Sequence, residues 1–296
     1  MPTYLKPDVL ARAESLGLMA KQVVEGLRVG DHKSPYKGFS VEFVQHREYV
    51  PGDDIRHIDW KSYGRSERYT IKQYEQETNY IAHMLVDISN SMRYGSRETN
   101  KLEYAKLLAA SLSYLIIRQR DSVDLRVFND AWAAELHASS QLGHINAITH
   151  ILEETQPRDK TRIGPLLDEL ADRISRRGLV FLISDCFDDP ETTLAALRHL
   201  RFRKHEVVLF HVLHQDEVEF PLDGNVRFIG LEGFEELMSR PHLLRPAYLR
   251  AVNRYLAAMQ KGCDGSGVDY VRMVTNRPLV VSLGEYLVRR LQTGRR

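Results

Sequence analysis

From residue 79 onward, short apolar runs alternate with segments in which apolar residues recur at helical spacing. Residues 80–89, 179–187 and 206–214 are almost continuously apolar, which is typical of strands covered on both faces. Residues 101–119 carry apolar side chains at the spacing of one helix face. Strands that alternate with crossover helices predict an α/β fold with a doubly wound, mostly parallel sheet.

The remaining segments of this region continue the alternation. We expect a hairpin over 122–139, helices over 143–155, 163–177, 190–203, 245–263 and 282–292, an edge hairpin near 225–233 and a strand over 269–276. Gly178 is expected to be the C-cap of the helix before it, and Pro190 to lie in the first turn of the helix that it begins.

Residues 1–78 have a different character. A short helical pattern runs from Val9 to Gly26, and residues 40–50 and 68–77 alternate apolar and polar side chains as strands do. Between these strands, residues 51–67 are rich in turn formers. We therefore expect two domains, with an N-terminal helix and a small β-rich module over 1–78 and the α/β domain over 79–296.

Composition excludes several classes of protein. A net charge of +1 argues against a general nucleic-acid binder. The two cysteines, Cys186 and Cys263, form no framework of disulfides, which fits a reducing compartment, and Cys186 is expected to be a buried and inert thiol. No run approaches the roughly 18 apolar residues of a membrane-spanning helix, and no secretory signal is evident. We expect a cytoplasmic protein with no transmembrane segment.

Two of the apolar runs end on an aspartate, Asp87 and Asp185. Ligands of open α/β sheets bind beyond the carboxyl ends of the strands, so both side chains are expected at a functional edge. Ser89 and Ser91 follow Asp87 at every second position and would point to the same side of an extended chain. Thr161 lies just before another expected helix and adds a third hydroxyl.

Together these residues supply two carboxylates and three hydroxyls, a set of oxygen ligands only. Oxygen ligands suit Mg²⁺ or Mn²⁺, whereas zinc prefers nitrogen and sulfur. Mg²⁺ usually takes one or two carboxylates and keeps several waters, so a coordination position can remain free for a carboxylate of another molecule.

The stretch DISNSM resembles the DxSxS signature of the von Willebrand factor A domain and its metal-ion-dependent adhesion site. The resemblance covers roughly residues 79–293 and implies that a threonine and an aspartate from two further loops complete the site. Carried over onto this sequence, the implied metal ligands are Asp87, Ser89, Ser91, Thr161 and Asp185.

The N-terminal region resembles the domain-of-unknown-function-58 family of bacteria. The match runs from Glu42 and Phe43 through Arg47 and Tyr49 into PGDDIRHIDW, which covers 51–60. Members with this signature are often associated with MoxR-type AAA+ ATPases and are thought to assist the assembly or maturation of complexes. We expect a structural role for the PGDDIRHIDW segment itself, with Trp60 packed against a neighbouring element.

The polar residues allow other interpretations. Serines and aspartates after a strand commonly cap the next helix, and Asp185 could cap the helix that begins near Pro190. A metal-dependent phosphatase or phosphodiesterase could use Asp87 and Asp185, although no second acid stands two residues after Asp87 and no lysine that would hold phosphate is obvious. The motifs of serine hydrolases and nucleotide-binding loops are absent from the sequence. We therefore expect a non-enzymatic module that binds an acidic residue of a protein partner through a metal ion.

Overall fold

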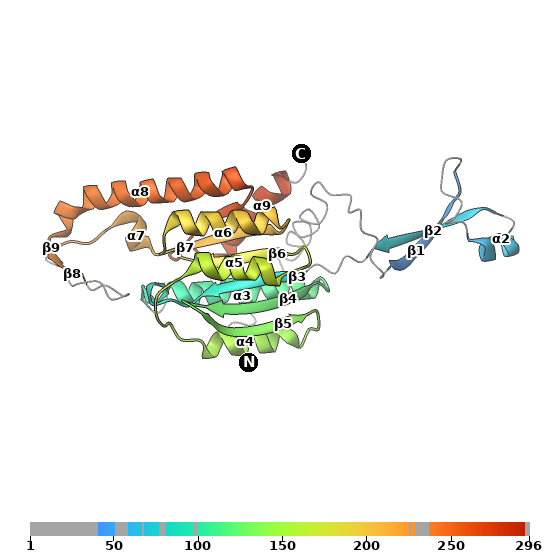
Figure 1. Ribbon diagram of the computed structural model, residues 1–296, viewed down its shortest axis with the longest axis horizontal. Helices are drawn as coiled ribbons and strands as arrows, with labels where there is room; N and C mark the ends of the chain where they lie inside the picture. The colour runs from blue at the N-terminus through green and yellow to red at the C-terminus, as the bar shows by residue number, and fades with distance from the viewer. Residues whose placement is uncertain are drawn as a thin grey trace. The chain divides into compact units, whose positions relative to one another are not determined.

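The computed structural model describes residues 41–50, 59–66, 68–76, 81–96, 100–224, 226–228 and 237–293. The chain divides into two compact units, one within Asp31–Asn79 and one that contains Tyr80–Arg296 (Figure 1). The helix expected from Val9 to Gly26 lies outside the described residues, as does most of the PGDDIRHIDW segment.

The smaller unit contains the expected pair of strands. β1 (Val41–Glu48) and β2 (Thr70–Gln76) are antiparallel, with an irregularity between Phe43 and Gln45. A short helix that the sequence analysis did not predict, α2 (Trp60–Ser66), lies between them in the chain. The β-rich module is therefore present, with one helix added to it.

Asp59 explains why α2 begins where it does. Its buried side chain accepts a hydrogen bond from the Ser62 backbone N–H at 3.2 Å, which is the geometry of an N-cap. Trp60 was expected to be packed, but it is 62% exposed in this structure and meets only the edge of the Tyr63 ring among the described aromatic contacts. The Tyr63 ring stacks instead on Tyr69 at 4.5 Å, so Trp60 at the helix start is left outside that stack.

The larger unit is built on a six-stranded sheet with the strand order β10-β7-β6-β3-β4-β5. All neighbouring strands are parallel except β4 and β5, which form the expected hairpin. The strands are β3 (Ile81–Asp87), β4 (Ser122–Phe128), β5 (Trp132–Ser139), β6 (Leu179–Ser184), β7 (Glu206–Leu213) and β10 (Asp269–Val274). The predicted doubly wound α/β fold is confirmed.

The order of the strands creates a switch point between β3 and β6. The chain passes from β3 outward to β4 and β5, then returns to β6 on the other side of β3 and continues to β7 and β10. Crevices at such a switch, beyond the carboxyl ends of the strands, are where open α/β sheets bind ligands.

Helices cover both faces of this sheet (Figure 1). One face packs against α3 (Lys101–Arg118), α4 (His144–Glu154) and α9 (Leu279–Thr293). The other packs against α5 (Ile163–Arg173), α6 (Pro190–Phe202) and α8 (Pro241–Ser266). Among the described residues, no helix combines the length and the apolar character that crossing a membrane requires.

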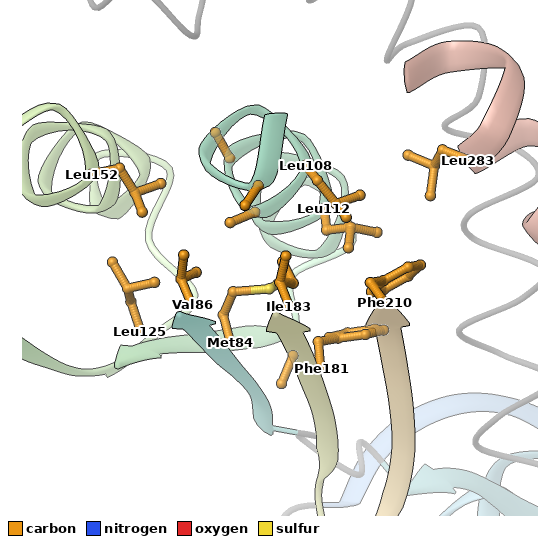
Figure 2. Close-up of a cluster of buried hydrophobic side chains, with 14 of the residues drawn as sticks. Met84, Val86, Leu108, Leu112, Leu125, Leu152, Phe181, Ile183, Phe210 and Leu283 are labelled. Carbon is orange, nitrogen blue, oxygen red and sulfur yellow. The ribbon is translucent and has the colours of Figure 1, made fainter. Parts of the chain in front are cut away.

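Side chains of the central strands alternate between the two faces. Met84 and Val86 of β3 belong to the cluster under α3, whereas Leu85 belongs to the cluster under α5 and α6. Figure 2 shows the first cluster, in which Met84 and Ile183 point toward Leu108 of α3. Full burial of such side chains stabilises the fold by about 1.5–3 kcal/mol each, which makes the sheet a firm base for the loops at its carboxyl edge.

Gly178 does not have the expected role of a C-cap. α5 ends at Arg173, and the backbone N–H of Ile174 closes the helix by bonding the Leu170 carbonyl. A Cβ at Gly178 would lie 2.7 Å from the Ile81 carbonyl oxygen and 2.8 Å from the His83 ring, so glycine is required by the close approach of this segment to β3.

Four short elements complete the described part of the larger unit: η3 (Asn90–Arg93), α7 (Gln215–Glu219), β8 (Val226–Phe228) and β9 (Leu237–Ser239). The last pair forms a separate antiparallel ribbon, so the hairpin expected at the edge of the main sheet is not part of that sheet.

Candidate functional site

The polar residues singled out in the sequence lie at the switch point of the sheet. Asp87 is the last residue of β3, and Asp185 directly follows β6, the neighbouring parallel strand. Asp87 and Ser89 are fully buried, and Ser91, Thr161 and Asp185 are no more than 6% exposed. Three loops therefore bring their oxygen atoms into one buried position.

The DxSxS stretch is compact. The Ser89 backbone N–H donates to Asp87 Oδ1 at 2.8 Å, and the Ser89 and Ser91 hydroxyls are 2.9 Å apart. The chain does not stay extended after β3, because the 3-10 helix η3 begins at Asn90. The expected extended geometry is therefore wrong for Ser91, but the tight turn brings its hydroxyl to Ser89 all the same.

Thr161 reaches Asp87 from a second loop. Its hydroxyl lies 3.5 Å from Oδ1 and 3.4 Å from Oδ2 of Asp87. Backbone hydrogen bonds fasten this loop to the first one: Arg158 N–H donates to the Ile88 carbonyl, and Asn90 N–H donates to the Asp159 carbonyl, both at 2.9 Å.

Asp185 is held by groups that the sequence did not point to. Its Oδ2 accepts a hydrogen bond from the Lys101 ammonium at 2.7 Å, and its Oδ1 accepts from the Phe187 N–H at 3.2 Å. Burial lowers the pKa of His211 to about 4, so its ring is neutral near pH 7. A neutral ring donates from Nε2 to the Asp185 carbonyl at 2.8 Å, which fixes the backbone at the end of β6.

Lys101 is 1% exposed and also donates to Glu217 Oε1 at 2.6 Å. Burial by itself lowers the pKa of this ammonium, but the charges of Asp185 and Glu217 outweigh burial and raise the pKa above its ordinary value. The site therefore contains a permanent internal cation between two carboxylates. The lysine that the sequence analysis did not find near these aspartates is present, at the first residue of α3.

Asp87 is the carboxylate without a cationic partner among these contacts. Burial raises the pKa of Asp87 to about 7, and the charge of Asp185 adds to the rise. Hydrogen bonds from Ser184 and Ser89 stabilise the ionised form and oppose part of this effect. A cation beside Asp87 would relieve the cost of burying its charge.

Helix capping does not explain these residues. Asp189, rather than Asp185, caps α6 by accepting from the Thr192 N–H, and Pro190 occupies the first turn as expected. Ser89 stands at the N-cap position of η3 but makes no side-chain cap hydrogen bond. Cys186, directly after Asp185, is buried as expected, and this burial raises the pKa of its thiol.

The donor set suits a hard divalent cation. Among the described residues, no group of three or more His, Cys, Asp or Glu side chains could hold a metal, so an ion here would depend on the hydroxyls. Asp87 with Ser89, Ser91 and Thr161 provides an arrangement of oxygens only, as Mg²⁺ or Mn²⁺ prefers. Both carboxylate oxygens of Asp185 already accept hydrogen bonds, from Lys101 and from the Phe187 N–H. Its negative charge would help to balance the charge of a cation bound beside Asp87.

Exposed cations surround the loops that form the site. They are Arg93 in η3 and Arg158, Lys160 and Arg162 in the Thr161 loop. Within the part of the chain that the structure describes, none of these four, which we call the basic rim, forms an ion pair. Phe187, two residues after Asp185, is 55% exposed. The loops that form the site thus carry exposed cations and an exposed aromatic ring, together with the exposed carboxylates of Asp159 and Asp189.

Lys101, Glu217 and Ser184 were missed by sequence reasoning. One signal for Lys101 was present, because it precedes Ala105, Leu108 and Leu112 at the spacing of the buried face of α3. A lysine on an apolar stripe must find buried partners, but the sequence does not say which ones. Glu217 gives no such signal, because α7 is only five residues long.

Fold and site together define an α/β module with a buried cluster of carboxylate and hydroxyl oxygens at the switch point of its sheet. The chain belongs to the family described as "Protein of unknown function DUF58", which matches residues 45–257. The family expected from the PGDDIRHIDW signature is therefore confirmed.

Similar proteins are known from mycobacteria. An uncharacterized protein of Mycobacterium tuberculosis is 27% identical over 289 residues, which cover 96% of this chain and 90% of the relative. An uncharacterized protein of Mycobacterium bovis matches with the same figures.

Two solved structures are similar at a lower level. An aerotolerance-related membrane protein from Bacteroides fragilis has a TM-score of 0.46 and 19% identity, over 72% of this chain and 99% of that one. The VWA domain of SpRpn10 has a TM-score of 0.40 and 12% identity, over 70% of this chain and 94% of that one.

Proposed function

We propose that the site at the carboxyl ends of β3 and β6 binds Mg²⁺ or Mn²⁺ and, through this ion, an acidic residue of a protein partner. Asp87, Ser89, Ser91 and Thr161 would hold the ion, and Asp185 would balance its charge. The observation that carries the proposal is the convergence of four buried side chains from two loops, with the charge of Asp185 acting on Asp87 from a third. The bound ion would supply an open coordination position for a carboxylate.

The charges around the site favour an acidic partner. The basic rim would attract a negatively charged segment, since complementary potentials steer association and reject wrongly charged partners. The exposed Phe187 ring, two residues after Asp185, would offer an apolar contact to the same partner.

In the cell, we propose, the module acts without catalysis of its own and assists the assembly or maturation of protein complexes. A MoxR-type AAA+ ATPase is the partner that the sequence resemblance implies. Mixing the pure chain with such an ATPase in Mg²⁺ and in EDTA, followed by analytical ultracentrifugation, would test the association. A complex that forms equally well in EDTA would contradict the role of the metal.

Calorimetry tests the metal itself. Asp87→Asn keeps the shape of the side chain but removes the charge, and we expect Mg²⁺ affinity to fall at least tenfold, because weaker perturbations around metal sites already cost 10–100-fold. Asp172→Asn, an exposed position on α5, is the matched control and should bind Mg²⁺ as the natural chain does. Equal Mg²⁺ binding by the natural chain and Asp87→Asn would refute the proposal.

A metal-dependent phosphatase or phosphodiesterase is the second candidate, and the buried Lys101 is the observation that favours it. However, Lys101 points to Asp185 and Glu217, and the Glu217 carboxylate would repel a phosphate there. A phosphatase screen of the pure chain with Mg²⁺ and Mn²⁺ distinguishes the two candidates. Turnover by the natural chain that is lost in Asp185→Ala would favour the hydrolase over the non-catalytic binding module.

A further inference from the structure

The Lys101 ammonium forms ion pairs with two carboxylates, one inner and one outer. Asp185, whose side chain is 3% exposed, is the inner one, and Glu217, whose side chain is 29% exposed, is the outer one. Both distances, 2.7 and 2.6 Å, are those of charge-assisted hydrogen bonds. Lys101 itself is 1% exposed, so Glu217 stands between the ammonium and solvent.

Glu217 belongs to an element that is only lightly attached. α7 has five residues, none of them buried. Besides the Lys101 ion pair, its tertiary contacts are hydrogen bonds: the Tyr94 hydroxyl donates to Asp216 Oδ2 at 3.0 Å, the Tyr248 hydroxyl to the Glu217 carbonyl at 3.1 Å, and Arg245 to the Glu219 carbonyl at 3.2 Å. Apolar packing is found at the end of α7, where the buried Phe220 ring lies 4.4 Å from the Tyr248 ring. The part of α7 that carries Glu217 buries no side chain, so it opens at a lower free-energy cost than the packed elements of the core.

The charges allow one kind of exchange. Removing Glu217 alone would leave a buried ammonium with one carboxylate fewer, which is strongly unfavourable. Replacing Glu217 by the carboxylate of another molecule leaves the charge of the site unchanged, so the cost of burial is the same before and after.

We propose that Lys101 is a carboxylate-binding group of this site and that Glu217 is its internal ligand, which an acidic side chain of a partner replaces. This inference rests on the proposed function in that the partner is acidic, but it requires no metal. Lys101 and the ion beside Asp87 would then be two cations that receive acidic side chains, with α7 moving aside when the partner binds.

Chemical rescue tests the proposal. Glu217→Ala removes a fragment the size of acetate next to Lys101, so sodium acetate should fill the space. All measurements are made in EDTA at constant ionic strength, so the result does not depend on whether Asp87 binds Mg²⁺. Glu219→Ala, an exposed position on the same helix, is the matched control.

We expect acetate to raise the melting temperature of Glu217→Ala above its value in chloride, with no such rise for the natural chain, for Glu219→Ala or for the neutral analogue acetamide. Acetate at ten times its Kd would shift the ratio of folded to unfolded protein about elevenfold. Adding Lys101→Met to Glu217→Ala should abolish the effect.

If Glu217→Ala is unfolded in chloride, recovery of the folded state in acetate is the expected result. Acetate that acts no better than chloride or acetamide on Glu217→Ala, or equally well on Glu219→Ala, would overturn the proposal. Failure of Mg²⁺ to bind would refute the metal site and leave this result standing.

Discussion

Lys101 is a buried cation whose charge is compensated by two carboxylates. It lies at the start of α3 with its ammonium buried between Asp185 and Glu217. Removal of one member of a buried ion pair leaves the other charges uncompensated, which costs roughly 3–5 kcal/mol. The position therefore matters for stability as well as for binding.

Lys101→Met keeps most of the side-chain volume and should lower the free energy of unfolding by roughly 3–5 kcal/mol. Lys261→Met, an exposed position on α8, should change it by less than about 0.5 kcal/mol. Urea titrations of both variants measure the difference. Equal stability of the two would mean that the ion pair with Asp185 and Glu217 contributes nothing.

His205 makes stability depend on pH. Burial, followed by the charges of His83 and Arg203, lowers the pKa of His205 to about 4 from an ordinary value of 6.5. Between these values the unfolded chain binds a proton that the folded chain does not, so this histidine destabilises the fold as the pH falls from 6.5 toward 4.

His205→Asn removes the titration while leaving an oxygen that can accept the Gly178 N–H, as His205 Nδ1 now does. When the pH falls from 7.5 to 4.5, the free energy of unfolding of the natural chain should decrease by about 2–3 kcal/mol more than that of the variant. Denaturant unfolding of both chains at the two pH values provides the comparison. Identical losses would show that His205 titrates normally in the folded state.

At the residue scale, Asp87, Ser89 and Ser91 could be singled out because they lie at local spacing after an apolar strand, and Asp185 because it ends a second apolar run. Lys101 and Glu217 could not, because they are 116 positions apart in the chain and meet Asp185 only once β6 and β7 are packed. Serines and aspartates after a strand have a recognisable signature, whereas the position of Lys101 on the apolar face of α3 indicates burial but does not name its partners.

The central strands are the elements that the sequence defines best. β3, β6 and β7 are buried almost throughout, and continuous apolar runs of this length are typical of strands covered on both faces. The elements that were missed, α2, η3 and α7, have seven residues or fewer. Their formation depends on caps and tertiary contacts, which periodicity does not reveal.

Gly178 tests how tightly these strands are joined. Gly178→Ala would place a Cβ against the Ile81 carbonyl oxygen. We therefore expect this substitution to lower the free energy of unfolding by about 1–3 kcal/mol or more. At Gly143 a Cβ meets nothing within 4 Å and φ is −64°, so Gly143→Ala should be neutral or stabilise by up to about 1 kcal/mol. Thermal unfolding of the Gly178→Ala and Gly143→Ala variants measures the difference in stability. A mild effect at Gly178 would mean that the segment can move away from β3.

For the whole molecule, the class of fold could be predicted but the order of the strands could not. Alternating strands and helices imply a parallel sheet, yet many strand orders satisfy the same pattern. The order that forms places β3 beside β6 and so brings Asp87 and Asp185 together. The division into two domains near residue 79 stays a prediction, although the structure separates Asp31–Asn79 from Tyr80–Arg296.

Crystals of the full chain grown with Mn²⁺ would show whether the site at Asp87 binds a metal ion, because the anomalous scattering of manganese locates the ion. We expect an anomalous peak bounded by Asp87, Ser89, Ser91 and Thr161, which disappears in crystals of Asp87→Asn. A peak only elsewhere in the molecule, or none at saturating Mn²⁺, would contradict the proposed metal site.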